Sequence, residues 1–301
     1  MATLFAILAI IGIWRKDRPE YFGLGTAQRI GLRDYWEVLK NNRAIQMLVV
    51  AASTDKLFMS VQANTTIMTV LYGVIFGNIA LQGQMSSLVM IPTVVINFLG
   101  IKFVASRMGQ KKALLFGTYG AIATSVLMFF LLVFGNPSSF SFTNISFFTI
   151  AFCLLWILQK GFSGISGNIV IPMTADCADY ETYRSGKYVP GLMGTLFSFV
   201  DKIISSLAST IVALMFAAVG YAKEVPTDKS PWSPGLFWVV VIAFTIIPII
   251  GWLCNVVAMK FYPLTKEKME EIQDAIAEIK AQNQAEAEAA AAAEAVESEM
   301  V

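Results

Sequence analysis

The chain has 301 residues, of which 56% are hydrophobic and only 14% are charged, with a formal net charge of +1. Ordinary globular domains carry about 25% charged residues, so this composition and a mean hydropathy of +0.64 predict an integral membrane protein. The near-neutral charge excludes a nucleic-acid-binding face, and the absence of histidine excludes histidine triads, histidine metal ligands and imidazole proton relays. We expect that the protein binds no cofactor and that it is not an enzyme.

The first part of the chain is apolar but short. Residues 1–14 cannot cross a membrane by themselves, because a crossing takes about 20 residues. Arg15, Lys16 and Arg18 follow, as basic residues follow the cytoplasmic end of a transmembrane helix. We therefore expect residues 1–14 to be the end of a helix that begins upstream, in a truncated chain.

Residues 15–43 are polar and predict a cytoplasmic loop. Within it, an amphipathic helix on the inner membrane surface is indicated by apolar residues that share one helical face, namely Leu32, Tyr35, Trp36, Val38 and Leu39. An ordinary linker is the alternative interpretation.

Six apolar segments are long enough to cross a hydrocarbon core of about 30 Å. They lie near residues 44–72, 79–103, 112–134, 145–172, 191–219 and 236–260. Basic residues gather in every second loop, so the positive-inside rule places both ends of a six-helix bundle over residues 44–262 in the cytoplasm. The predicted fold is that of an all-α membrane protein, in which a partial helix is followed by six spans. We expect the chain to cross the cell membrane repeatedly and to contact the lipid bilayer.

Residues 263–301 form the predicted cytoplasmic tail. Thr265 is a candidate N-cap, and Met269, Ile272, Ile276 and Ile279 fall on one stripe of a charged helix. Beyond Lys280 the sequence is low-complexity and rich in Ala and Glu, with little to bury.

Five charged residues share one depth in the predicted spans. Each lies about 11 to 12 residues from the cytoplasmic end of its span, or ~17 Å at 1.5 Å per residue. They are Asp55, Lys56, Lys160, Asp201 and Lys202. Because an ionisable group at this depth is costly unless it faces a wet cavity, we predict a substrate and coupling cavity, to which Ser198 adds a hydroxyl group.

Pairing among these charges is the alternative, for example Asp201 with Lys160 or Asp55 with Lys202, which would only hold helices in register. Sequence neighbours lie about 100° apart on a helix, so Asp201 and Lys202 cannot both aim at one point. Either of the two could face the cavity while the other faces a neighbouring helix.

Residues 176–202 resemble the glycoside-pentoside-hexuronide:cation symporters of the major facilitator superfamily, the melibiose permease-like family. Asp176, Asp179, Tyr180, Tyr183 and Gly186 match the loop between helices ten and eleven of that family. Lys202 stands at the helix-eleven lysine that the family uses in coupling cation to sugar. A second match, over residues 100–112, resembles the superfamily's cytoplasmic loop after helix eight, with Ser106 in place of the usual acid.

The resemblance implies that residues 1–262 correspond to the end of helix six, the middle loop and helices seven to twelve. The chain would then be the C-terminal half of a cation-coupled sugar or glycoside symporter that works by alternating access and is inactive without its N-terminal bundle. The coupling cation, Na⁺ or H⁺, would bind mostly in that other half. Cytoplasmic gate candidates are Asp176, Asp179, Tyr183, Arg184, Lys187 and Arg107.

Two other functions stay open at this point. One is a truncated membrane scaffold that does not transport. The other is a membrane-embedded transferase acting on a lipid-linked sugar, for which Asp176 and Asp179 are the only acidic pair at the membrane edge.

Overall fold

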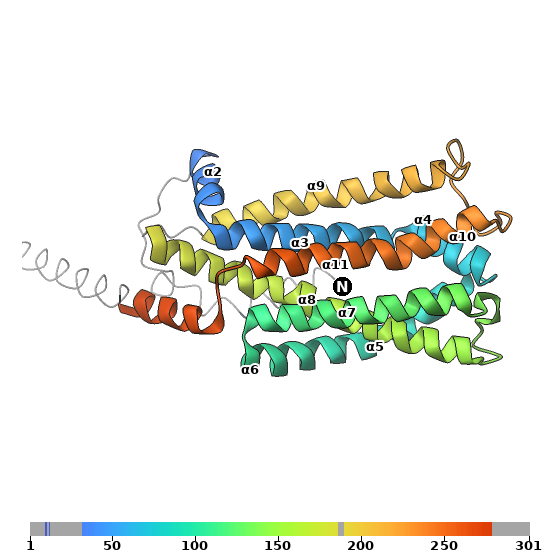
Figure 1. Cartoon of the computed structure of the whole chain (residues 1–301), viewed down its shortest axis with the longest axis horizontal. Helices are drawn as coiled ribbons and strands as arrows, with labels where there is room; N and C mark the ends of the chain where they lie inside the picture. Colours follow the sequence, from blue (N-terminus) through green and yellow to red (C-terminus); the bar gives the residue numbers. More distant parts are fainter. Residues whose placement is uncertain (1–9, 11, 13–31, 186–189, 279–301) are drawn as a thin grey trace, which may run out of the picture.

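The structure is a computed structural model that describes residues 10, 12, 32–185 and 190–278, and every regular element in this part of the chain is a helix. Long helices lie side by side along the longest axis of the molecule, with the start of α3 and the end of α11 at the same end (Figure 1). Most of the predicted segment 1–14 and most of the predicted loop 15–43 lie outside the described residues.

The elements follow one another as single or broken helices. The first are α2 (Leu32–Asn41), α3 (Arg43–Gln62), α4 (Thr65–Thr69) with the π-helix η2 (Val70–Ile75), α5 (Ala80–Gly100) with η3 (Ile101–Ala105), and α6 (Ser106–Met108). Then come α7 (Gln110–Phe134), the short η4 (Pro137–Ser139), α8 (Phe147–Ser185), α9 (Pro190–Ala217), α10 (Pro234–Val241), η5 (Ile242–Ile246) and α11 (Ile247–Lys260). A last helix covers residues 266–278.

Six helical segments are long and apolar enough to cross a membrane, which confirms the predicted all-α class with six spans. They are Arg43–Ile75, Ala80–Met108, Gln110–Phe134, Phe147–Ser185, Gly194–Ala217 and Pro234–Lys260. The exposed apolar side chains along α5, such as Met90, Ile91 and Phe98, suit a surface that faces lipid or another helix bundle.

The predicted spans 145–172 and 191–219 leave a loop over residues 173–190, and this prediction is wrong for most of its length, because α8 passes through Pro172 and continues to Ser185. Four buried residues in this stretch, Met173, Cys177, Ala178 and Glu181, repeat with helical spacing. The drop in hydropathy after residue 172 therefore marks the end of the apolar part of α8 and not the end of the helix.

Two apolar clusters form the core, one toward each end of the bundle. One joins Ile45, Leu48 and Ala51 of α3 to residues of α7, α8, α11 and the helix 266–278. The other begins at Val61 and contains a group of packed aromatic rings, in which Phe152 and Phe244 are fully buried. Between the two clusters, α3 and α8 carry polar and charged residues, so the polar layer lies in the middle of the bundle.

Close packing of α7 on α8 depends on glycine. A Cβ atom at Gly117 would lie 2.7 Å from the carbonyl oxygen of Phe162 and 2.8 Å from the amide nitrogen of Ser166, and backbone atoms cannot move aside as a side chain can. At Gly83 on α5, by contrast, a Cβ would meet nothing within 4 Å.

We expect Gly117→Ala to lower the free energy of unfolding by about 1–3 kcal/mol, since the two helices would have to separate. Gly83→Ala should raise it by about 0.5–1 kcal/mol, because alanine is the better helix former and nothing obstructs it. Denaturation in mixed detergent micelles, followed by circular dichroism, measures both. Equal effects of the two substitutions would contradict the proposed close packing.

Candidate functional site

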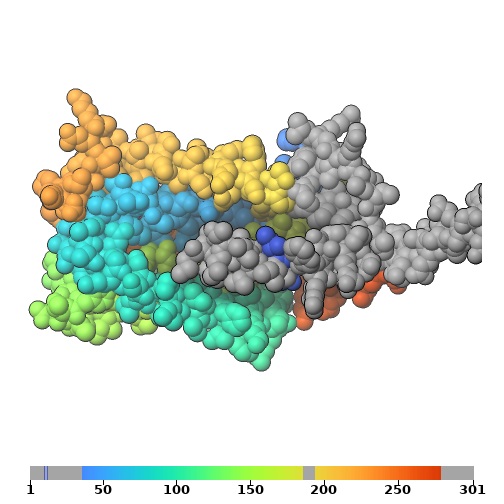
Figure 2. All heavy atoms as spheres, turned by 180° about the vertical axis from the view of Figure 1, so that it is seen from behind, coloured from blue at the N-terminus to red at the C-terminus, as the bar shows by residue number. Residues whose placement is uncertain are grey.

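All five charged residues of the middle layer, together with Ser198, line one cavity of about 830 Å³. Helix α3 contributes Asp55 and Lys56, α8 contributes Lys160, and α9 contributes Asp201 and Lys202. Helix α5 adds Thr93 and Asn97. Seen from behind, α8 is visible in the recess between α3 and α5, next to α9 (Figure 2). Whether these residues bind substrate stays a prediction, but the structure does bring them to one place.

The ion pair in this layer differs from the pairs considered from the sequence. Lys56 Nζ lies 3.3 Å from Asp201 Oδ1, so Asp201 pairs across to α3 and not with Lys160. Both side chains are about half exposed, and such pairs contribute about 0–1 kcal/mol. The pair therefore orients α9 against α3 more than it stabilises the bundle. Lys202 lines the cavity and forms no ion pair within the described ranges.

Among the residues that the structure describes, no carboxylate forms an ion pair with Lys160. Its Nζ donates to Gln62 Oε1 at 3.2 Å and lies 4.4 Å from the centre of the Trp156 ring, a cation–π contact. Because these contacts are with uncharged groups, they do not neutralise the ammonium. Its positive charge can therefore attract an anionic group of a ligand in the cavity.

Gln62 connects the lysine to a buried polar network between the two apolar clusters. Its Nε2 donates to the carbonyl oxygen of Phe244 at 2.6 Å and to Gln159 Oε1 at 3.2 Å. Gln159 Nε2 in turn donates to Ser125 Oγ, so the network links α3, α8, η5 and α7. Sequence reasoning noted the depth of the charges but missed Gln62, whose only signal is a polar residue at the end of an apolar helix.

Asp55 is the most deeply buried charge of the layer, with 7% of its surface exposed. Its Oδ1 receives no hydrogen bond from any described residue, although the indole of Trp252 lies beside the carboxylate. A buried carboxylate without a full set of donors is costly, which is typical of a site that is completed by a ligand.

The structure separates the gate candidates. Asp176, Asp179, Tyr183 and Arg184 lie on the last turns of α8, whereas Arg107 lies exposed on α6 and forms no ion pair in the described part of the chain. Lys187 lies outside the described residues. Their role in gating stays a prediction.

Asp176 lines a second, smaller cavity of about 220 Å³, between α7, α8 and the helix 266–278. Lys111 Nζ donates to the carbonyl oxygen of Tyr262 at 2.6 Å, and the Tyr262 hydroxyl lies 3.7 Å from Cys177 Sγ. Burial raises the pKa of the Tyr262 hydroxyl above its ordinary value, so it stays protonated at physiological pH. Met269, Ile272 and Ile276 are buried here, so this part of the tail packs on the bundle. Ile279 lies outside the described residues.

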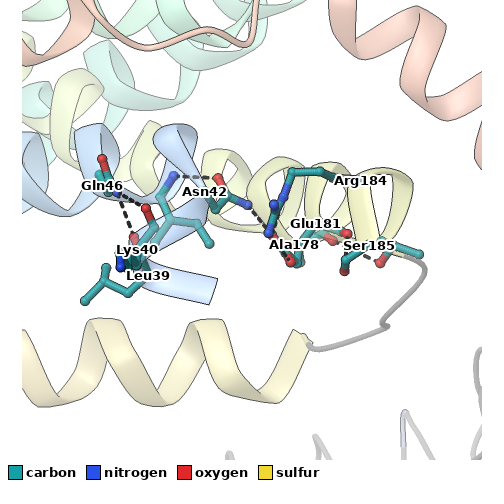
Figure 3. A network of polar contacts seen from close by, with 10 residues as sticks. Leu39, Lys40, Asn42, Gln46, Ala178, Glu181, Arg184 and Ser185 are labelled. Carbon is teal, nitrogen blue, oxygen red and sulfur yellow. Dashed lines mark hydrogen bonds and ion pairs between the residues drawn. The ribbon is translucent and has the colours of Figure 1, made fainter. Parts of the chain in front are cut away.

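Glu181 is the buried centre of a network at this end of α8, and sequence reasoning missed it (Figure 3). Arg184 Nη2 donates to Glu181 Oε1 at 2.8 Å, and Asn42 Nδ2 donates to Glu181 Oε2 at 2.8 Å. Asn42 Oδ1 also accepts from the amide of Ile45, which caps the start of α3. Through these hydrogen bonds the Glu181 carboxylate connects α8 to the junction between α2 and α3.

The helical bundle, with six helices long and apolar enough to cross a membrane, defines a multi-pass membrane protein, and its polar cavity lies in the middle of the bundle. The family described as "MFS/sugar transport protein" matches residues 1–266, and the chain belongs to this family. The family predicted from residues 176–202 is thereby confirmed.

Two relatives are transport proteins and not enzymes. The chain is 26% identical over 249 residues, 78% of its length, to the glucuronide carrier protein homolog of Escherichia coli (strain K12), of which it covers 47%. It is 23% identical over 170 residues, 56% of its length, to the isoprimeverose transporter of Lactiplantibacillus pentosus, of which it covers 32%. The chain thus spans about half or less of the length of these curated relatives.

Proposed function

We propose that the chain is the C-terminal half of a cation-coupled sugar or glycoside symporter, and that its central cavity binds the sugar. The observation that carries this proposal is the placement of Asp55, Lys56, Lys160, Asp201 and Lys202 around one cavity in the middle of the bundle. Charges at this depth are costly in a membrane protein unless they serve a binding or transport site.

The chemistry of the cavity suits a glycoside. Lysine ammonium groups donate charged hydrogen bonds, and Asp55, Ser198 and Asn97 supply oxygen atoms for hydroxyl groups. The carrier homolog of Escherichia coli is named for a glucuronide, whose carboxylate would complement Lys160 and Lys202. An anionic glycoside is therefore the first substrate to test.

Alternating access in this proposal requires a second bundle, because one bundle alone leaves its polar middle layer without a matching wall. The coupling cation, Na⁺ or H⁺, binds mainly in that second bundle. The bound cation changes the net charge of the cavity and thereby the electrostatic energy of Lys202. The end of α8, with Asp176, Asp179 and Arg184, and the start of α9 form the gate. The chain resides in the cytoplasmic membrane with its C-terminus in the cytoplasm.

Binding and uptake test this proposal separately. The purified full chain in detergent should be stabilised against heat by millimolar methyl glucuronide or isoprimeverose, since a ligand that binds the folded state raises its melting temperature. Vesicles that contain only this chain should show no sodium- or proton-driven uptake of either sugar. Uptake by such vesicles would contradict the need for a second bundle, and the absence of any stabilisation would favour a scaffold without a sugar site.

A further inference from the structure

Three buried oxygen atoms on the cavity wall receive no hydrogen bond from the described residues. They are Asp55 Oδ1 on α3 and, on α5, Thr93 Oγ1 and Asn97 Oδ1. Folded proteins leave few buried acceptors without a donor, because each has lost its water without replacement. Three such atoms in one cavity indicate an occupant that donates hydrogen bonds.

The two oxygens on α5 face the same way and are not satisfied within their own helix. Thr93 and Asn97 are four residues apart, so they stack on one helical face. Elsewhere on α5, Ser86 donates to the carbonyl oxygen of Gln82 at 2.8 Å and Ser87 to that of Gly83 at 3.1 Å. Thr93 has no corresponding bond to a described residue, and the residue lies on the cavity wall.

Helix α8 makes room for the side chain of Asn97 with a glycine, and a second glycine follows one turn later. A Cβ atom at Gly164 would collide with the side-chain amide of Asn97, and a Cβ at Gly167 would lie 3.9 Å from Asp55 Oδ2. Both glycines line the cavity. The absence of a side chain at Gly164 therefore lets the Asn97 amide lie against α8, while the distance at Gly167 is that of an ordinary contact and shows only that Asp55 lies near α8.

The charge of the cavity decides between two kinds of occupant. Carboxylate, amide and hydroxyl oxygens could ligate a cation, but three lysines and two aspartates line this cavity, which leaves a surplus of positive charge. That surplus disfavours a bound cation and leaves neutral donors. Hydroxyl groups of a sugar ring are such donors, and they also accept from the lysines.

We propose that Asp55, Thr93 and Asn97 form an acceptor wall that binds the hydroxyl groups of a sugar ring and selects sugars by their hydroxyl pattern. This inference rests on the proposed function, in which the cavity binds a sugar. It adds Thr93 to Asp55 and Asn97, and it assigns the recognition of the hydroxyl pattern to these three residues, on the side formed by α3 and α5. A site built to receive hydroxyl donors discriminates strongly against analogues that lack them.

The test uses the purified full chain in detergent, with methyl glucuronide and its 2-, 3- and 4-deoxy analogues as probes. Thr93→Val and Asn97→Leu should each lower the affinity for methyl glucuronide by about 2- to 10-fold, the range for a neutral hydrogen bond. Each variant should also lose the ability to distinguish one deoxy analogue from the parent sugar. Without sugar, their melting temperatures should be unchanged or raised, because no protein partner is lost. Ser86→Ala, on the same helix but bonded to its own backbone, should bind like the unchanged chain.

The outcomes separate the two proposals. If the unchanged chain binds the sugar and both variants bind every analogue as it does, the acceptor wall is wrong and the proposed function stands. If the unchanged chain binds none of the probes, both are wrong. A marked loss of melting temperature without sugar would assign the oxygens to structural water. Sodium-dependent stabilisation that Asp55→Asn abolishes, with sugar affinity intact, would assign a cation site. Either result overturns the acceptor wall.

Discussion

Lys202→Ala should lower the affinity of the chain for methyl glucuronide by roughly tenfold to a hundredfold. Lys202 lines the central cavity and is not neutralised by an ion pair within the described part of the chain, so its ammonium is available to the ligand. A hydrogen bond to a charged group contributes about 1.5–3 kcal/mol, which corresponds to this loss. Isothermal calorimetry on the purified chain measures the effect.

Two comparisons make this result specific to the cavity. Lys102→Ala removes the same charge from an exposed position outside the cavity and should leave the affinity unchanged. The affinity for uncharged isoprimeverose should fall less than that for the glucuronide, because no carboxylate is then present to pair with the ammonium. Full affinity for the glucuronide in Lys202→Ala would assign this lysine a structural role.

Asn42→Leu should lower the apparent melting temperature by about 5–15 °C. The substitution removes the cap of α3, which contributes about 1 kcal/mol, and leaves the buried Glu181 carboxylate without one of its donors, which costs about 1–3 kcal/mol. For a chain of this size each kcal/mol shifts the melting temperature by about 2–4 °C. A thiol-reactive dye reports the melting, since Cys177 is buried in the folded chain.

The double substitution Asn42→Leu with Glu181→Leu tests the reason for this loss. Removing both partners avoids the unpaired buried carboxylate, so the double variant should be more stable than the sum of the single effects predicts. Glu37→Gln on the exposed side of α2 is the matched control and should change little. Strictly additive effects would show that Asn42 and Glu181 do not act on each other.

Helix α8 takes part in two polar networks, one around Lys160 and Gln159 at the cavity and one around Glu181 at the cytoplasmic rim proposed as the gate. Lys160 and Gln159 belong to the middle layer, whereas Glu181 and Arg184 lie more than five helical turns further on, at 3.6 residues per turn. Because α8 is continuous between them, a rotation of this helix would move both networks at once. Binding in the cavity and contacts at the rim would then be mechanically linked.

The sequence by itself determined the six spans and the common depth of the five charges, because crossing hydrocarbon requires long apolar helices and helical rise converts residue number into depth. It also pointed to the family through residues 176–202. Only the tertiary structure decided that Lys56 pairs with Asp201, that Gln62 holds Lys160 and that Asn42 meets Glu181, which is distant in sequence. The rotation of each helix about its axis and the neighbour it faces depend on the packing of the whole bundle, and no local pattern of residues contains that information.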